Sequence, residues 1–132
     1  MGKNEPSLDE WLAEAKKDPG AAQCGMFLSH NGVVRITPKQ FAREGKEGLG
    51  DVEAIEFSYD ADGLERIVEE AKTWPGVHYV RVWLNEGRLE VGESIMYVLI
   101  GADIRPRCID ALQRLVGHIK DNLVVEKEIY AS

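Results

Sequence analysis

The sequence is short of cysteine, of histidine motifs and of metal-ligand clusters, and these shortages exclude several classes of protein. Its two cysteines, Cys24 and Cys108, have neither metal-ligand spacing nor the density of a disulfide scaffold, so both are expected to be buried thiols. The three histidines are scattered, and the sequence alone assigns no role to His30 or His118. No metal or other cofactor is therefore expected.

The chain also has little excess basic charge and no long apolar run. A formal net charge of -7 disfavours a nucleic-acid partner, because phosphate binding needs clustered Lys and Arg, so an anionic ligand would need a local basic pocket. The most apolar run, residues 95–102, is too short to cross a bilayer, and residues 1–6 lack the apolar core of a signal peptide. A cytoplasmic protein without a membrane segment is expected.

Sequence signatures of common catalytic sites are missing as well. There is no GxSxG elbow, no P-loop and no GxGxxG, and Cys108 has no obvious histidine and acid nearby. Nucleophilic hydrolase chemistry finds no support.

The pattern of apolar residues predicts a single α+β domain, residues 1–132, with a mixed or antiparallel sheet and about three helices. The first helix follows the capping box Ser7 to Glu10, the second starts at Asp60 or Asp62, and the third runs from Asp103 and Pro106 to Asn122. A turn is predicted at Asn31-Gly32 and a surface loop over residues 37–51. Strands are predicted over residues 23–29, 33–36, 55–59, 77–84, 87–91, 94–100 and 123–129.

Several basic residues fall at element boundaries, although the chain is acidic. They are Arg35, Arg105, Arg107, Lys120 and Lys127. Arg105 and Arg107 lie at a strand-to-helix junction, where free amides and the helix dipole favour a phosphate or carboxylate. Lys120, in the last turn of the same helix, either belongs to a site or neutralises the negative helix end. Lys127 lies between two glutamates, so a surface salt bridge is its competing interpretation.

Segments carrying several of these residues resemble the large, catalytic subunit of molybdopterin synthase, from Gly25 almost to the end of the chain. The last and most specific match is a pair of lysines seven residues apart, Lys120 and Lys127, the separation of the family's catalytic pair. The other matching segments, in the family's order, are Gly32-Val-Val-Arg35, residues 64–71, residues 87–98 and Gly101-Ala-Asp-Ile-Arg105.

The resemblance implies the α/β-hammerhead fold and a sulfurtransferase activity in molybdenum cofactor biosynthesis. In this family, a ubiquitin-like small subunit carries a thiocarboxylate on its C-terminal glycine, and its sulfur is transferred to cyclic pyranopterin monophosphate. A homodimer that becomes a heterotetramer with the small subunit is the assembly implied.

The resemblance also implies residue roles. Lys120 would activate or position the reacting groups, Lys127 would assist in the same pocket, and Arg35 and Arg105 would bind the substrate phosphate. Arg107 has no counterpart in the family and is added as a substrate-binding candidate beside Arg105.

One departure from the family pattern leaves the activity open. Ile104 stands where the family has a histidine before the last helix. A divergent but active synthase and an inactive paralogue that binds a ubiquitin-like tail or a pterin phosphate are both consistent with this change. An unrelated α+β interaction domain with only surface charges is the third alternative.

Overall fold

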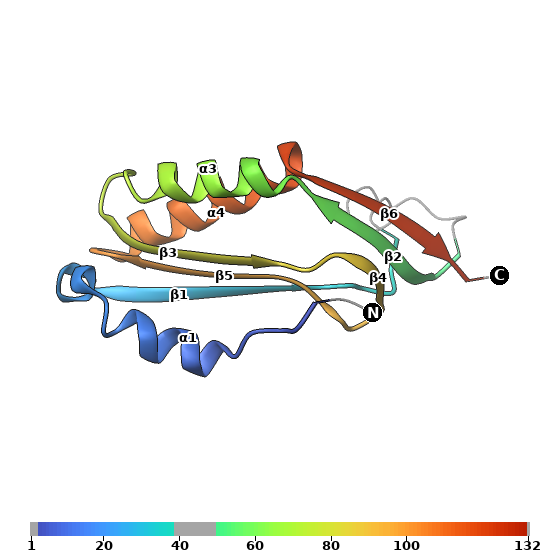
Figure 1. The fold of residues 1–132 in the computed structure, drawn as a ribbon, viewed down its shortest axis with the longest axis horizontal. Coiled ribbons are helices and arrows are strands. Elements are labelled where there is room, and N and C mark those ends of the chain that lie inside the picture. The colour runs from blue at the N-terminus through green and yellow to red at the C-terminus, as the bar shows by residue number, and fades with distance from the viewer. Residues whose placement is uncertain (1–2, 39–49, 132) are drawn as a thin grey trace.

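The computed structural model describes residues 3–38 and 50–131, and it arranges them as helices packed against two three-stranded sheets (Figure 1). The first sheet contains β1 (Met26–Val33), β5 (Ser94–Ala102) and β3 (Val77–Leu84), in the order β1-β5-β3. The second contains β4 (Gly87–Glu90), β2 (Val52–Tyr59) and β6 (Val124–Tyr130), in the order β4-β2-β6. All four strand pairings are antiparallel.

The helices cover both faces of the first sheet, as Figure 1 shows: α3 (Ala61–Ala71) and α4 (Arg105–Asn122) lie on one face, and α1 (Leu8–Ala15) lies on the other. A short 3-10 helix, η1 (Pro19–Gln23), leads into β1. Ser7 caps α1 by accepting from the Glu10 amide, and Asp60 caps α3 by accepting from the Gly63 amide. Pro106 lies in the first turn of α4, where the helix does not need the amide hydrogen that proline lacks.

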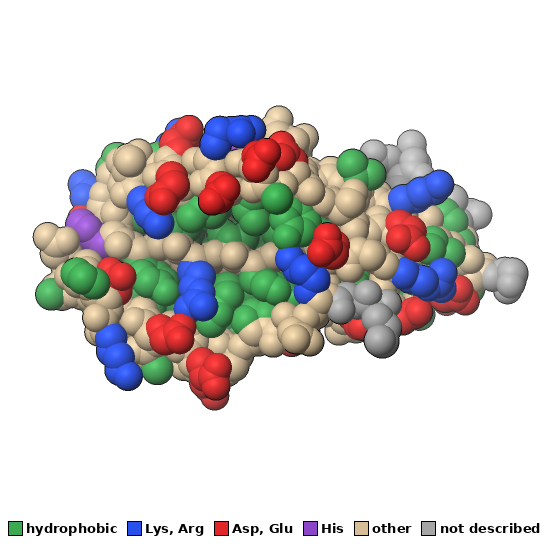
Figure 2. Space-filling view, in the orientation of Figure 1, with side chains coloured by type: hydrophobic (Ala, Val, Ile, Leu, Met, Phe, Trp, Pro, Cys, Tyr) green, Lys and Arg blue, Asp and Glu red, His purple; other side chains and the backbone are tan. Residues whose placement is uncertain are grey.

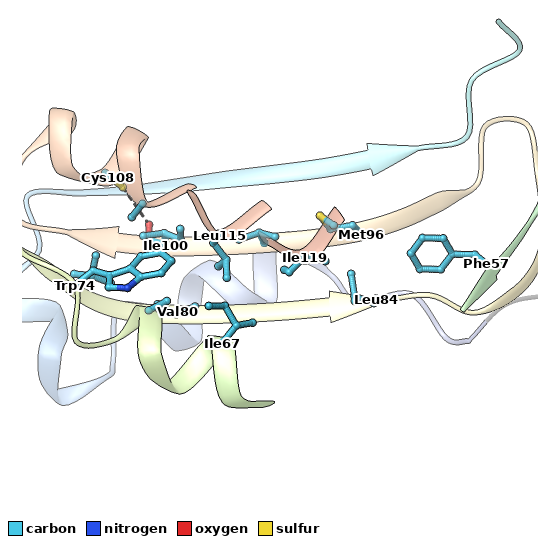
Figure 3. Close-up of a cluster of buried hydrophobic side chains, with 14 of the residues drawn as sticks. Phe57, Ile67, Trp74, Val80, Leu84, Met96, Ile100, Cys108, Leu115 and Ile119 are labelled. Carbon is cyan, nitrogen blue, oxygen red and sulfur yellow. Dashed lines mark hydrogen bonds between the residues drawn. The ribbon is translucent and has the colours of Figure 1, made fainter. Parts of the chain in front are cut away.

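The two sheets and the helix pair α3 and α4 share one apolar core (Figure 3). Leu115 and Ile119 of α4 are fully buried, and Phe57 of the second sheet belongs to the same cluster. A smaller cluster lies under α1 and includes Trp11 and Tyr97. Because β5 packs on both faces, nearly all its residues are buried, as the apolar run in its sequence indicates.

The fold class, the three α-helices and the order of the elements are confirmed, but the prediction for the first strand is wrong in three respects. The strand starts at Met26 rather than residue 23, it passes through Asn31-Gly32 without a turn, and no strand is formed over residues 34–36. Asn31 and Gly32 are instead held in the ladder with β5, and the Asn31 side chain donates to the Met96 carbonyl at 3.1 Å. Pairing with a strand far along the chain has overridden a local turn signal.

Most of the predicted loop over residues 37–51 lies outside the described residues, which leave out 39–49. In the described part of the chain, no helix is both long and apolar enough to span a bilayer. Cys108 is buried as predicted, and burial raises the pKa of its thiol; Cys24 is only partly buried, which differs from the prediction.

Candidate active site

A small cavity of about 30 Å³ lies where the first sheet, the second sheet and the end of α4 meet, and this volume is about that of one water molecule. Figure 3 shows Met96 and Phe57 at this end of the core. Most of the lining is apolar; Lys120 is the single cation and Glu126 the single anion among the described residues that form it. The complete lining is Gly32, Val33, Phe57, Ile95, Met96, Lys120, Val124 and Glu126.

Lys120 reaches this cavity because of the way α4 packs. The buried stripe of α4 ends at Ile119, which is fully buried, so the next residue lies at the border between core and solvent. Lys120 belongs to the last turn of the helix, is exposed, and is one of the residues that line the cavity. This position does not decide between the two sequence interpretations of Lys120, as a site residue and as a charge at the helix end.

His30, to which the sequence assigned no role, lies beside the same cavity. It pairs with Val98 in the ladder and belongs to the row of β1 side chains that includes Leu28 and Gly32, on the face covered by α4. A Cβ added to the cavity residue Gly32 would lie 3.6 Å from His30 Nε2. Burial lowers the pKa of His30, and the charge of Lys120 lowers it further. His30 and Lys120 therefore interact across the end of the core.

The predicted phosphate-binding residues are divided between two ends of the molecule. Arg35 lies two residues after Val33, which lines the cavity, and its Nε donates to the Thr37 carbonyl at 3.0 Å. Arg105 is at the opposite end of α4 from Lys120, and 15 residues at 1.5 Å each put their backbones about 22 Å apart. Within one chain, Arg105 and Lys120 do not share a pocket.

Arg107 lies beside Arg105 but has a partner within the fold. Its Nη1 donates to Asp103 Oδ2 at 2.7 Å. This exposed ion pair links the first turn of α4 to the segment between β5 and α4. Arg105 is exposed and has no ion-pair partner among the described residues.

Lys127 is placed on β6 opposite Glu56, whereas Glu126 is placed opposite Phe57. Directly paired residues share a face of the sheet and successive residues alternate, so Lys127 is on the face away from the cavity residues Phe57 and Glu126. The structure brings Lys120 to the cavity, and Lys127 is not one of the lining residues.

His30 and Glu126 are the polar residues at the cavity that the sequence did not single out. The alternation of Leu28, His30 and Gly32 is a signal that could have placed His30 on an inward face, but only for a strand continuing past Gly32. The Asn31-Gly32 turn signal pointed the other way. Among the described residues, no group of three or more His, Cys, Asp or Glu side chains could hold a metal ion.

A larger and more open groove of about 420 Å³ lies between α3 and the edge strand β3. Figure 2 shows apolar side chains gathered on this face with charges of both signs around them. Apolar lining residues include Leu64, Val68 and Val82, and charged ones include Glu65 and Arg81. None of the sequence-predicted site residues lines it, and it lies beside the edge of the first sheet that β3 forms.

Together these features define a class: a small α+β domain in which a lysine at a helix end lines an apolar cavity between two antiparallel sheets. A family model described as MoaE protein matches residues 2–122, and the chain therefore belongs to the MoaE protein family. This is the family that the sequence resemblance indicates, and membership connects the chain with molybdopterin biosynthesis.

Solved structures share the fold at low sequence identity. Molybdopterin synthase from Staphylococcus aureus is 20% identical with a TM-score of 0.70, and the match covers 97% of this chain and 88% of that one. Molybdopterin cofactor biosynthesis protein E from Burkholderia multivorans is 22% identical with a TM-score of 0.70 and coverage of 98% and 84%. A complex of subunits 1 and 2 of molybdopterin-converting factor from Helicobacter pylori gives 20% identity, a TM-score of 0.63 and coverage of 96% and 85%. No curated protein matches the sequence significantly.

Proposed function

We propose that this chain is the catalytic subunit of a molybdopterin synthase, transferring sulfur from a thiocarboxylated small subunit to cyclic pyranopterin monophosphate. Family membership supports the pathway, and the relative from Helicobacter pylori, which is a complex of two subunits, supports a small-subunit partner. The observation that carries the proposal is the position of Lys120, which is one of the residues lining an apolar cavity at the end of strand β1.

The size of the cavity decides what it can receive. A volume of about 30 Å³ admits one small group and is far too small for a pterin. We assign it to the reacting end of the small subunit's tail, where a glycine, having no side chain, can enter a narrow space. The pterin then lies outside the cavity, on the side where Arg35 follows Val33.

In this arrangement Lys120 acts through its charge. A thiocarboxylate is an anion, and Lys120, an exposed cation that lines the apolar cavity, attracts it; the attraction strengthens when the bound tail excludes water from the pair. The same charge would stabilise the negative charge that develops on the carbonyl oxygen when water adds to the acyl carbon, before the carbon–sulfur bond breaks and leaves the sulfur on the pterin and a carboxylate on the tail. A role for Lys127 in the same step stays a prediction, since its side of β6 faces away from the cavity.

The separation of Arg105 from Lys120 supports a homodimer. Because about 22 Å of helix divides them, Arg105 can bind the phosphate of a substrate near Lys120 only if it comes from a second copy of the chain. We therefore include a homodimer with a shared site in the proposal. Mixing Lys120→Ala subunits with Arg105→Ala subunits tests it, because a shared site gives one intact site per mixed dimer and partly restored product formation. Unrestored activity in confirmed mixed dimers would refute the shared site.

The test of the activity is incubation with a thiocarboxylated small subunit and cyclic pyranopterin monophosphate, with detection of the dithiolene product. Lys120→Ala is expected to lower the rate at least about 100-fold, as loss of one preorganised charge at a reacting group does. Lys72→Ala is the matched control, because Lys72 also lies at a helix C-terminus, as the C-cap of α3, but far along the chain from the cavity.

Three outcomes are distinguishable in this assay. Product from wild type and from Lys72→Ala, but not from Lys120→Ala, supports the proposal. Equal small losses in both variants would mean that Lys120 only neutralises its helix end. No product from the folded wild type with a competent partner would remove the enzyme claim.

A second candidate function is favoured by Ile104. This residue is 52% exposed at the N-cap of α4, makes no side-chain cap, and stands where the resemblance places a histidine. A paralogue that binds the small subunit without catalysis would retain a measurable affinity for the thiocarboxylated tail and form no product. Isothermal titration with the small subunit, alongside the product assay, separates this function from the synthase.

A further inference from the structure

The imidazole of His30 has a buried nitrogen without a partner. Nε2 of His30 is inaccessible to solvent and forms no hydrogen bond among the described residues, one of two such side-chain atoms found there. A buried polar atom left without a hydrogen bond is costly, so its retention calls for a functional reason or a partner. The nitrogen lies next to Gly32, which lines the cavity.

The surroundings of His30 make Lys120 the candidate for that partner. On β5, the paired residue Val98 is apolar and fully buried, so it offers no hydrogen bond. From α4, Lys120 is close enough for its charge to act on the imidazole, and from β6 the charged residue at the cavity is Glu126. Figure 3 shows Ile119, the residue before Lys120, at the same end of the core as Met96, which pairs with Gly32. The remaining donor among the described lining residues is the ammonium group of Lys120, which has no hydrogen bond or ion pair among those residues.

The charge state of His30 decides the direction of the hydrogen bond. A protonated imidazole would repel the lysine, and burial together with the Lys120 charge lowers the pKa of His30, which favours the neutral ring. A neutral imidazole has one nitrogen that accepts. Nε2 can therefore accept from an ammonium group that has three donors and no acceptor.

We propose that His30 is a positioning residue for Lys120: its Nε2 accepts a hydrogen bond from the Lys120 ammonium group when the cavity is engaged. A lysine in the last turn of a helix has a long and flexible side chain, and a fixed acceptor on a strand holds it over the cavity. His30 brings an imidazole to the cavity from β1, whereas Ile104, where the resemblance places a histidine, lies at the opposite end of α4 from Lys120. The catalytic consequence rests on the proposed function of Lys120, whereas the contact between the two residues does not.

The contact is tested by titrating the histidine ring signals of the whole protein by NMR. In Lys120→Ala the pKa of His30 is expected to rise toward its ordinary value, because the nearby positive charge is removed. Lys127→Ala is the matched control and leaves the titration of His30 unchanged, since this lysine lies on the other face of β6. An unchanged His30 titration in Lys120→Ala would overturn the proposal, whatever the protein's activity.

The positioning role is tested by two substitutions at His30 in the product assay. His30→Phe keeps a ring among apolar neighbours but has no acceptor, and kcat is expected to fall roughly 10- to 100-fold with KM changed less than about threefold, as a misplaced catalytic group does. His30→Gln restores an acceptor near the position of Nε2 and is expected to recover most of the rate. Full activity in His30→Phe, or a glutamine variant as slow as the phenylalanine one, would overturn the role.

The two readouts keep this proposal separate from the proposed function. If the wild type forms no product while Lys120→Ala shifts the His30 titration, the enzyme claim fails and the contact stands. If product depends on Lys120 but the His30 titration does not respond to that substitution, the function stands and the positioning role fails.

Discussion

Replacing Gly32 with alanine should separate stability from activity at the cavity. Gly32 does not have a positive φ, and the new Cβ would lie 3.6 Å from His30 Nε2 and 3.7 Å from Met96 Cβ, which are ordinary van der Waals distances. The methyl group therefore fits without displacing the backbone, but it occupies the cavity of about 30 Å³. The structure thus predicts that the fold tolerates a substitution that the site does not.

The magnitude follows from the cost of glycine in a strand. Glycine inside a strand is less favourable than alanine by about 0.5–1 kcal/mol, so the free energy of unfolding of Gly32→Ala should rise by about that amount. With an unfolding entropy of about 2.1 cal/mol/K per residue, the rise corresponds to a Tm increase of roughly 2–4 °C. Sulfur transfer should fall at least about 10-fold, because the space for the reacting group is filled.

The assays are thermal unfolding followed by circular dichroism and the dithiolene product assay. Gly117→Ala is the matched control: Gly117 lies inside α4, and an added Cβ meets nothing within 4 Å. This control should gain about 1 kcal/mol, the helix-propensity difference, and keep its activity. A Gly32→Ala protein that is more stable and fully active would refute the assignment of the cavity, and a destabilised one would refute the packing argument.

Two further predictions concern stability. Leu115→Ala should lower the free energy of unfolding by about 2–5 kcal/mol, because Leu115 is fully buried between α4 and the first sheet. Urea denaturation measures this loss, and a loss under about 1 kcal/mol would contradict the packing. The pKa of His30 in the folded protein is lowered below its ordinary value of 6.5. As the pH falls, the unfolded chain therefore takes up a proton at this histidine before the folded protein does. The stability contributed by neutral His30 is present above about pH 6.5 and decreases below it. His30→Phe should therefore lose less stability than wild type between pH 7 and pH 5, and identical pH profiles in urea denaturation would count against the lowered pKa.

Much of the fold could be predicted because its signals are local. The capping oxygens of Ser7 and Asp60, the Pro106 start of α4 and the apolar spacing of the helices are all written within a few residues of sequence. The β-branched and aromatic runs of β3 and β5 gave those strands nearly their observed bounds. These elements agree with the structure because tertiary contacts reinforce the local preference.

The first strand was mispredicted because its length depends on a distant partner. Asn31-Gly32 is a strong turn signal in isolation, but eight residues of β1 pair with β5, about 70 positions along the chain, and that ladder continues through the dipeptide, with an irregularity only after Gly32. The hydrogen bonds between β1 and β5, which are distant in the sequence, therefore outweigh the local preference of Asn31-Gly32 for a turn.

The candidate site was only partly predictable for the same reason. The place of Lys120 near the end of a helix could be deduced from spacing, but its approach to His30 depends on how α4 lies over β1, which no local pattern encodes. The seven-residue separation of Lys120 and Lys127 crosses from a helix into a strand, so it does not fix whether the two side chains share a face. The register of β6 decides that, and it is set by pairing with β2.

The regular pairing of β1 with β5 from Met26 to Gly32 makes the site sensitive to insertions and deletions. Successive side chains of a strand point to opposite faces, so one residue added between Met26 and Ser29, with the pairing of Met26 kept, would turn the imidazole of His30 away from α4 and toward α1. The polar side chain of Ser29 would then face the helix that carries Lys120. A chain of this kind can exchange side chains along β1, but it cannot change the number of residues there without dismantling the core and the site together.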